Sequence, residues 1–427
     1  MNLIRKFLPI GLLILSFFLL SYTYYKSEII WSGLNRNFYI YYYVISLIFV
    51  FFSLFTFYIS NKTKDYLIII ITSIAFSAYS FELFLTYQKK IGNLKIKKEI
   101  YKKETGKIFD DRSKFQVYKD LKKMDKNVVM VVPPNNHLNS KTNFLPLSGV
   151  SNSMTVNCNE NGEYFIFQSD RHGFNNPDNE WDNEQTEYLL VGDSYTLGAC
   201  VNRPHDMASI LRILSKKPVL NLGYNGNGPL LQYAALREYL DKNVKKILWF
   251  YFENNDLEDL TNELKSKTAT NYLNNLDFTQ NLKINEKQIN SEVNKIIEKQ
   301  KAVSSDVINF LKIYNTRLSI QPKKKTRLQK EYKEILNLAN SLAEENSSKL
   351  YFIYLPTYER YIRKVDNTNY QSIKKMVEEI NIPFLDMHEE VFLYEEDPLN
   401  LFPFKLSGHY NMEGYKKIST SIFKLTN

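Results

Sequence analysis

The sequence predicts an α/β protein with three N-terminal transmembrane helices, followed by a three-layer α/β/α domain with a parallel sheet and a helical insertion. Two observations predict this architecture. Three charge-free apolar stretches open the chain, and from residue 187 onward short apolar runs alternate with helical patterns. Such alternation is typical of parallel strands joined by right-handed crossovers.

The apolar stretches cover residues 7–25, 38–60 and 66–81. Each is about long enough to cross a hydrocarbon core of about 30 Å. A cleaved signal peptide is the alternative for the first stretch, but it is longer than a usual h-region and lacks an A-x-A-like cleavage site. We therefore expect a membrane anchor over residues 1–88, with Glu82 toward the end of the third span.

The basic residues beside the spans give opposing signals about orientation. If Arg5 and Lys6 lie inside, Lys62 and Lys64 lie inside too, and the third span leads outward. The lysine-rich run over residues 89–103 favours the opposite orientation. Because long domains are translocated largely regardless of charge, we expect a protein of the bacterial inner membrane with a periplasmic, extracytoplasmic domain.

Residues 89–125 are predicted to form a basic, helical juxtamembrane stalk, and residues 126–427 one large domain. Within that domain, residues 127–133 resemble a short strand and the chain up to 183 is expected to be irregular. Residues 257–345 carry mostly polar helix pattern without strand-like runs. We expect them to form a helical insertion over or beside the site.

Polar residues follow the predicted strands where functional loops of a parallel sheet gather. Gly192-Asp193-Ser194 ends one apolar run, Gly226 lies in a loop after the next, and Asn255 ends a third. His409 arrives just before a final amphipathic helix. A serine hydroxyl needs a neutral imidazole to accept its proton, and the resulting oxyanion needs preorganised donors.

These four blocks, in this order, resemble the SGNH/GDSL hydrolase family. The resemblance implies a flavodoxin-like domain with Ser194 as nucleophile and His409 as base. It also implies an oxyanion hole from Gly226, Asn255 and the Ser194 N–H. In addition, residues 169–177 are similar to a segment in a subgroup found with cell-surface polysaccharide genes.

Each of these residues also has a structural alternative. His409 could cap the turn over residues 411–414, and Asn255 could cap the helix that follows it. Gly223 competes with Gly226 for the oxyanion role, since both lie in the same glycine-rich loop.

One position departs from the family pattern. The family places an aspartate three residues before the histidine, where this chain has Leu406. Three alternatives follow. The site is a Ser–His dyad in which a backbone carbonyl orients the imidazole, or a triad whose acid comes from another part of the chain, or an inactive site. Asp397 and Glu396 are the nearest upstream acids and are hypotheses for the missing member.

Cys158 and Cys200 are the only two cysteines. A disulfide between them is plausible in an extracytoplasmic domain and would tie the segment before residue 169 to the nucleophile loop. Two unrelated thiols are the alternative. Neither cysteine has zinc-ligand spacing, and we expect no metal and no cofactor.

The formal net charge of +9 comes partly from the juxtamembrane lysines and partly from residues 321–327. Such runs are most often solvated, with anionic lipid headgroups as an alternative partner for the first; we expect no nucleic-acid partner.

The sequence therefore predicts a membrane-anchored serine esterase or O-acyltransferase that acts on ester groups, acetyl among them, of an extracytoplasmic glycan. A transferase would need a separate membrane protein as acyl donor. A lipid-directed esterase is an alternative within the enzyme class. The rival class is a noncatalytic glycan-binding or assembly protein with a degenerate site, which Leu406 favours.

Overall fold

The computed structural model describes residues 2–30, 33, 36–88, 92–140, 144–241, 243–300, 305–320, 328–362 and 368–427. The chain forms two compact units. The first comprises Met1–Lys90 and Ser304–Pro322, and the second Ile91–Val303 and Lys323–Asn427.

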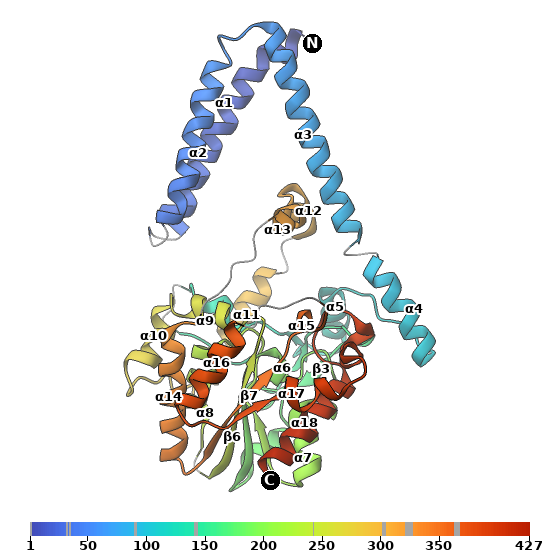
Figure 1. Cartoon of the computed structure of the whole chain (residues 1–427), viewed down its shortest axis with the longest axis vertical. Coiled ribbons are helices and arrows are strands. Elements are labelled where there is room, and N and C mark those ends of the chain that lie inside the picture. Colours follow the sequence, from blue (N-terminus) through green and yellow to red (C-terminus); the bar gives the residue numbers. More distant parts are fainter. Residues whose placement is uncertain are drawn as a thin grey trace. The chain divides into compact units, whose positions relative to one another are not determined.

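The first unit contains three long apolar helices, α1 (Asn2–Tyr24), α2 (Arg36–Phe55) and α3 (Asn61–Tyr87). All three are long and apolar enough to cross a membrane, and almost none of their surface is buried inside the protein. This confirms the three predicted apolar spans. An ion pair between Arg5 and Asp65 joins the starts of α1 and α3, so both begin at the same end of the unit (Figure 1).

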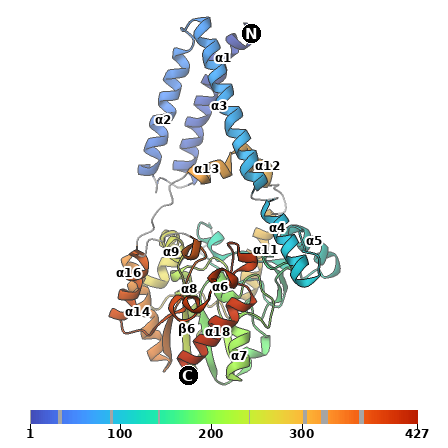
Figure 2. The ribbon, with the colours of Figure 1, turned by 45° about the vertical axis from the view of Figure 1, so that its right-hand side comes forward.

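Two short helices from far along the sequence complete this unit. They are α12 (Ser305–Leu311) and α13 (Tyr314–Ile320), and both contact α3. The two views show α1 and α2 side by side along their length (Figure 1, Figure 2).

The second unit is built on a five-stranded parallel sheet, which confirms the predicted fold class. Its strand order is β5-β4-β6-β7-β8. The bounds are β4 (Thr186–Val191), β5 (Val219–Asn221), β6 (Val244–Phe252), β7 (Lys349–Leu355) and β8 (Phe384–Asp386). The strands read as nearly continuous apolar runs because both faces of the sheet are covered by helices.

Alternate side chains of β4 show how the three layers form. Leu189 and Val191 belong to the apolar cluster under α8 (Pro229–Tyr239), α14 (Lys330–Glu345) and α16 (Thr368–Glu379). Tyr188 and Leu190 belong to the cluster under α7 (Met207–Ser215), α17 (Met387–Glu390) and α18 (Met412–Thr426). Successive residues of a strand point to opposite faces, so one short strand contributes to both cores.

The expected juxtamembrane stalk is two helices, α4 (Asn93–Thr105) and α5 (Lys114–Met124). Gly106 ends α4 in a left-handed conformation with φ +71°, and Ser113 begins α5 with a capping box. Val117 and Tyr118 of α5 are buried in the main core. The prediction of one stalk is therefore wrong for α5, which is part of the folded domain.

A second, small sheet consists of β1 (Val129–Met130), β2 (Met154–Val156) and β3 (Ile166–Gln168). β1 lies within the short strand expected over residues 127–133, whereas β2 and β3 lie in the stretch expected to be irregular. Strands of three residues are too short to leave a periodic pattern in the sequence. The small sheet precedes β4 in the chain, and Glu160 lies in the loop that joins β2 to β3.

The predicted insertion is helical in its described residues, with α9 (Asp256–Glu263), α10 (Lys267–Asn274) and α11 (Glu286–Gln300) before α12. Its last helix, α14, packs on α8 and β7 and is the crossover helix of the sheet. The insertion proper therefore ends before α14, and its middle belongs to the first unit.

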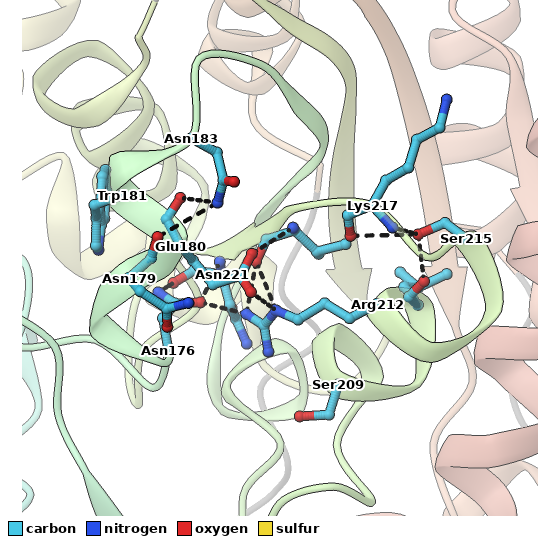
Figure 3. A network of polar contacts seen from close by, with 12 residues as sticks. Asn176, Asn179, Glu180, Trp181, Asn183, Ser209, Arg212, Ser215, Lys217 and Asn221 are labelled. Carbon is cyan, nitrogen blue, oxygen red and sulfur yellow. Dashed lines mark hydrogen bonds and ion pairs between the residues drawn. The ribbon is translucent and has the colours of Figure 1, made fainter.

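The segment over residues 169–177 lies along the edge strand β5. The side-chain amide nitrogen of Asn176 donates to the Asn221 carbonyl (3.0 Å). Its side-chain oxygen accepts from the Asn221 backbone N–H (2.9 Å) and from Arg212 (2.8 Å), as Figure 3 shows. The Asn221 amide donates in turn to the Thr196 carbonyl at 2.7 Å. The helix that carries Ser194 is thus tied to this segment through β5.

We expect Asn176→Ala to lower the free energy of unfolding by about 2 kcal/mol, because buried groups of Asn221 and Arg212 lose their partner. Urea denaturation of the purified chain in detergent, followed by tryptophan fluorescence, measures this. Asn183→Ala is the control, since Asn183 makes only solvent-exposed hydrogen bonds to Asn179 and Glu180, of 3.4 and 3.1 Å. Its effect should stay within about 0.5 kcal/mol. Equal effects of the two substitutions would contradict the role of Asn176.

Candidate active site

Ser194 is the first residue of α6 (Ser194–Leu197), directly after β4. The turn into α6 leaves no space for larger residues, because a Cβ on Gly192 would lie 2.0 Å from the Thr196 hydroxyl. The Asp193 side chain accepts the Tyr195 N–H at 2.8 Å and caps the helix. No partner is found for the Ser194 N–H among the described residues.

His409 contacts Ser194 directly. Its Nε2 lies 2.9 Å from the Ser194 Oγ. The Tyr195 ring lies 4.7 Å from the imidazole and stacks on Phe252 at 3.9 Å between ring centroids. The Tyr195 hydroxyl also donates to the Gly408 carbonyl at 3.0 Å. The residue after the serine therefore holds the loop that carries the histidine. The helix-capping alternative for His409 does not apply, since Asn411 caps α18.

Glu160 supplies the carboxylate that the chain lacks at Leu406. Its Oε1 lies 3.2 Å from His409 Nδ1, and its Oε2 accepts the His409 backbone N–H at 2.6 Å. The two acids proposed from sequence lie elsewhere: Asp397 pairs with Lys405 at 2.7 Å, and Glu396 is exposed. Both hypotheses are therefore wrong. The acid beside His409 comes instead from a loop that precedes Ser194 in the sequence.

Covalent and steric constraints place Glu160. Cys158 and Cys200 form a disulfide, with their Cα atoms 5.2 Å apart. The Asn161 amide donates to the Cys200 carbonyl at 2.9 Å. A Cβ on Gly408 would lie 2.5 Å from the Glu160 Oε2, so only a glycine at this position leaves room for the carboxylate. The disulfide thus holds the Glu160 loop beside the chain that leaves α6.

Sequence reasoning could have found Glu160. The Cys158–Cys200 disulfide, once considered, brings residues near 158 next to the nucleophile loop, and Glu160 is the acid two positions away. The family spacing points to a position just upstream of His409 instead.

The charges of this group reinforce one another. Burial lowers the pKa of His409, but the hydrogen bond and charge of Glu160 outweigh it and raise the pKa above the ordinary value. In the other direction, burial raises the pKa of Glu160, and the contacts with His409 reverse this to a lowered pKa. Glu160 is therefore ionised at neutral pH and favours the imidazolium that forms when a base takes a proton.

Asn255 lies at the end of β6, beside buried carboxyl groups. Its amide nitrogen donates to Asp259 at 2.7 Å, and its side chain makes no capping bond to α9. Burial raises the pKa of Asp193 to about 6 and that of Asp259 to about 7. The Asn255 side-chain amide is thus held by a neighbouring carboxyl group. Because this side chain does not bond to the start of α9, the helix-capping alternative for Asn255 does not apply.

Gly226 is left-handed, with φ +74°, and a Cβ there would lie 2.7 Å from the Asn135 amide nitrogen. It does not line the pocket beside Ser194. The rival Gly223 donates its N–H to Asn221 at 2.8 Å. For Gly226 no such acceptor is found among the described residues. The oxyanion role of Gly226 stays a prediction.

A cavity of about 230 Å³ opens beside these residues. Glu160, Ser194 and His409 line one part of it, together with Asn255. The loop after β7 supplies Thr357, Tyr358 and Glu359. The lining is mostly polar and the space is small.

Glu160, Cys200 and His409 offer atoms within 4.8 Å of one another, as a metal site would. The Cys200 sulfur is bonded to Cys158, however, and a metal ligand would have to be a thiolate. The arrangement suits proton transfer from serine to imidazole, with the ionised carboxylate orienting the ring and stabilising the imidazolium.

No family model and no curated protein matches the chain. Solved structures do match. One is a protein assigned to the G-D-S-L lipolytic family from Desulfitobacterium hafniense DCB-2, with 14% identity over 56% of this chain and 99% of that chain, and a TM-score of 0.33. Another is protein YXIM from Bacillus subtilis, with 12% identity over 56% and 55% of the two chains, and a TM-score of 0.31. Both identities are below 25% and both scores below 0.5, so these likenesses carry no argument about activity.

We expect the His409 imidazole to titrate above its ordinary pKa of about 6.5, and Glu160→Gln to lower that pKa. The substitution removes the attracting charge and keeps the burial that disfavours imidazolium. NMR titration of histidine-labelled protein measures both, with His409→Gln assigning the signal. Asp397→Asn is the matched control and should leave the titration unchanged. Identical curves for Glu160→Gln and the parent protein would contradict the contact.

Proposed function

We propose that the chain is a membrane-anchored serine hydrolase or acyltransferase that uses Ser194, His409 and Glu160 as a catalytic triad. The observation that carries the proposal is the hydrogen-bonded series Ser194 Oγ, His409 Nε2, His409 Nδ1 and Glu160 Oε1, with separations of 2.9 and 3.2 Å. Three side chains from distant parts of the sequence are aligned as nucleophile, base and orienting acid.

In the proposed reaction, His409 Nε2 takes the Ser194 proton while Oγ attacks the ester carbonyl carbon. The tetrahedral intermediate collapses, the C–O bond to the alcohol breaks, and the alcohol leaves with the proton from His409. The acyl group is then an ester on Ser194. Water or a sugar hydroxyl gives its proton to His409 and attacks this ester; the bond from the acyl carbon to Ser194 Oγ then breaks, and His409 returns the proton to Oγ. The imidazole must be neutral at the start, so activity falls as pH drops through its raised pKa.

The oxyanion needs donors on the side of the carbonyl away from the imidazole. The Ser194 N–H is at the N-terminus of α6, where no intrahelical acceptor exists. Asn255 lines the same cavity. Together with the Gly226 N–H they are the proposed oxyanion hole.

Small acyl groups suit this site. A mostly polar cavity of about 230 Å³ favours a short acyl group, such as acetyl, on a hydroxyl-rich alcohol over a long lipid chain. We therefore propose an acylated glycan as substrate, in line with the resemblance of residues 169–177 to polysaccharide-associated relatives. If the acceptor is a sugar hydroxyl instead of water, a membrane protein must bring the acyl donor.

The membrane anchor and the disulfide support the proposed location. Three apolar helices long enough to cross a bilayer precede the catalytic unit, and a disulfide beside the triad suits an oxidising compartment. We propose the bacterial inner membrane, with the catalytic unit on its periplasmic side.

The noncatalytic alternative rested on the missing acid at Leu406. Glu160 supplies a carboxylate at the same imidazole nitrogen, so a degenerate site is no longer needed to explain the sequence.

We expect a fluorophosphonate to form one covalent adduct with the purified chain and none with Ser194→Ala, because only an activated serine attacks this phosphorus. Intact-mass analysis detects the adduct. Ser407→Ala is the matched control, since Ser407 lines the same cavity but its hydroxyl is directed to Glu359, and it should keep the adduct. A folded parent protein that stays unlabelled would refute the proposed activity.

We expect Asn255→Ala to lower kcat for 4-nitrophenyl acetate by about 10²- to 10³-fold with a smaller change in KM, because an oxyanion donor acts in the transition state. Asn254→Ala is the control from the same loop and should have the smaller effect. If the two substitutions affect kcat alike, Asn255 is not the donor.

A further inference from the structure

The insertion between β6 and β7 leaves the catalytic unit and joins the unit of apolar helices. Residues 305–320, as α12 and α13, belong to the same compact unit as α1, α2 and α3. The Tyr79 hydroxyl of α3 donates to the Leu311 carbonyl at 3.0 Å, and the Tyr79 and Phe310 rings lie 5.6 Å apart. This segment is therefore docked on α3 and is not simply a loop of the catalytic unit.

Glu82 is the centre of that contact. Its side chain is fully buried, although it follows the long charge-free stretch of α3 over residues 66–81. One carboxylate oxygen accepts from the Asn315 N–H (3.1 Å) and side-chain amide (3.0 Å). The other accepts from the Thr316 N–H (2.7 Å) and hydroxyl (2.9 Å). An acid within a membrane helix requires polar partners, and here α13 provides all four bonds.

The segment also carries exposed apolar side chains. Val307 and Leu311 on α12 are each 61% exposed, and Leu318 and Ile320 on α13 are 47% and 73% exposed. Four large apolar side chains exposed within fourteen residues are unusual for a segment that faces water. The neighbouring helices of the same unit carry exposed apolar side chains of the same kind, which a bilayer would cover.

The charges near the segment suit the surface of such a bilayer. Lys312 and Arg317 are the basic residues within it, and residues 321–327 add three lysines and an arginine directly after it in the sequence. Basic side chains beside an apolar helix face are typical of helices that lie at the headgroup level of anionic membranes.

We propose that α12 and α13 form an interfacial element that inserts its apolar side chains into the lipid and is fixed there by Glu82. Glu82 lies near the end of α3 from which the chain continues into the catalytic unit, so the element lies at that face of the membrane. The catalytic unit is then joined to the membrane through the insertion as well as through α3. This inference rests on the membrane anchoring proposed above.

The test is photo-crosslinking of the full chain in vesicles of phosphatidylcholine with phosphatidylglycerol. Benzoylphenylalanine is placed at Leu318, and intact-mass analysis looks for a phospholipid adduct. The negative control is Leu276, which is 65% exposed on the catalytic unit, and the positive control is Ile48, which is 61% exposed on α2. We expect adducts at positions 318 and 48 and none at 276.

The controls separate the two proposals. An adduct at 48 without one at 318 overturns the interfacial element and leaves the anchor intact, whereas no adduct at either position overturns the anchor itself. In Glu82→Ala we expect the adduct at 318 to fall several-fold while that at 48 is unchanged. An unchanged adduct at 318 would show that Glu82 does not hold the element.

Discussion

The site depends on the pair of hydrogen bonds between Glu160 and His409. An imidazole that must alternate between accepting and donating a proton needs a fixed ring and a fixed tautomer, and the carboxylate at Nδ1 provides both. Here the same carboxylate also binds the backbone N–H of His409, so it holds the loop as well as the ring. In the proposed reaction, Ser194 can be activated only when that imidazole is in place.

Ser194 and Asn255 are held in place by the main sheet, whereas Glu160 is held by other constraints. The parallel sheet fixes Ser194 and Asn255 because both follow directly on buried strands. Glu160 has no such support, since it lies in a loop outside the main sheet. Its position comes from the disulfide to Cys200 and from Gly408, which leaves room for the carboxylate. A reducing compartment would remove the first of these constraints, which is a physical reason to expect the unit outside the cytoplasm.

The same contrast between residues at strand ends and residues in loops outside the main sheet explains what could be predicted from the sequence. Ser194 and Asn255 could be expected to lie close together because strand ends of a parallel sheet meet at one edge, and both line the same cavity as His409. The helices on both faces followed from periodicity. β1 lies in the strand predicted over residues 127–133, but β2, β3 and the position of α5 did not follow, because three-residue strands and a half-buried basic helix leave no clear pattern. The family spacing points to an acid just upstream of His409, whereas Glu160 is 249 residues away in a loop that no periodic pattern defines.

Glu82 repeats the situation of Glu160 in the other unit. Glu82 is fully buried and the Glu160 side chain is 24% exposed, and each carboxylate is bonded to a segment more than 200 residues distant in the chain. Because an unpaired buried carboxylate is costly, such a residue indicates that a partner exists even when the sequence cannot identify it. For Glu160 the partner is His409, the proposed base, and for Glu82 it is the start of α13. In both cases the carboxylate fixes a segment that periodicity leaves undefined, and we propose that the first of these segments meets substrate and the second meets lipid.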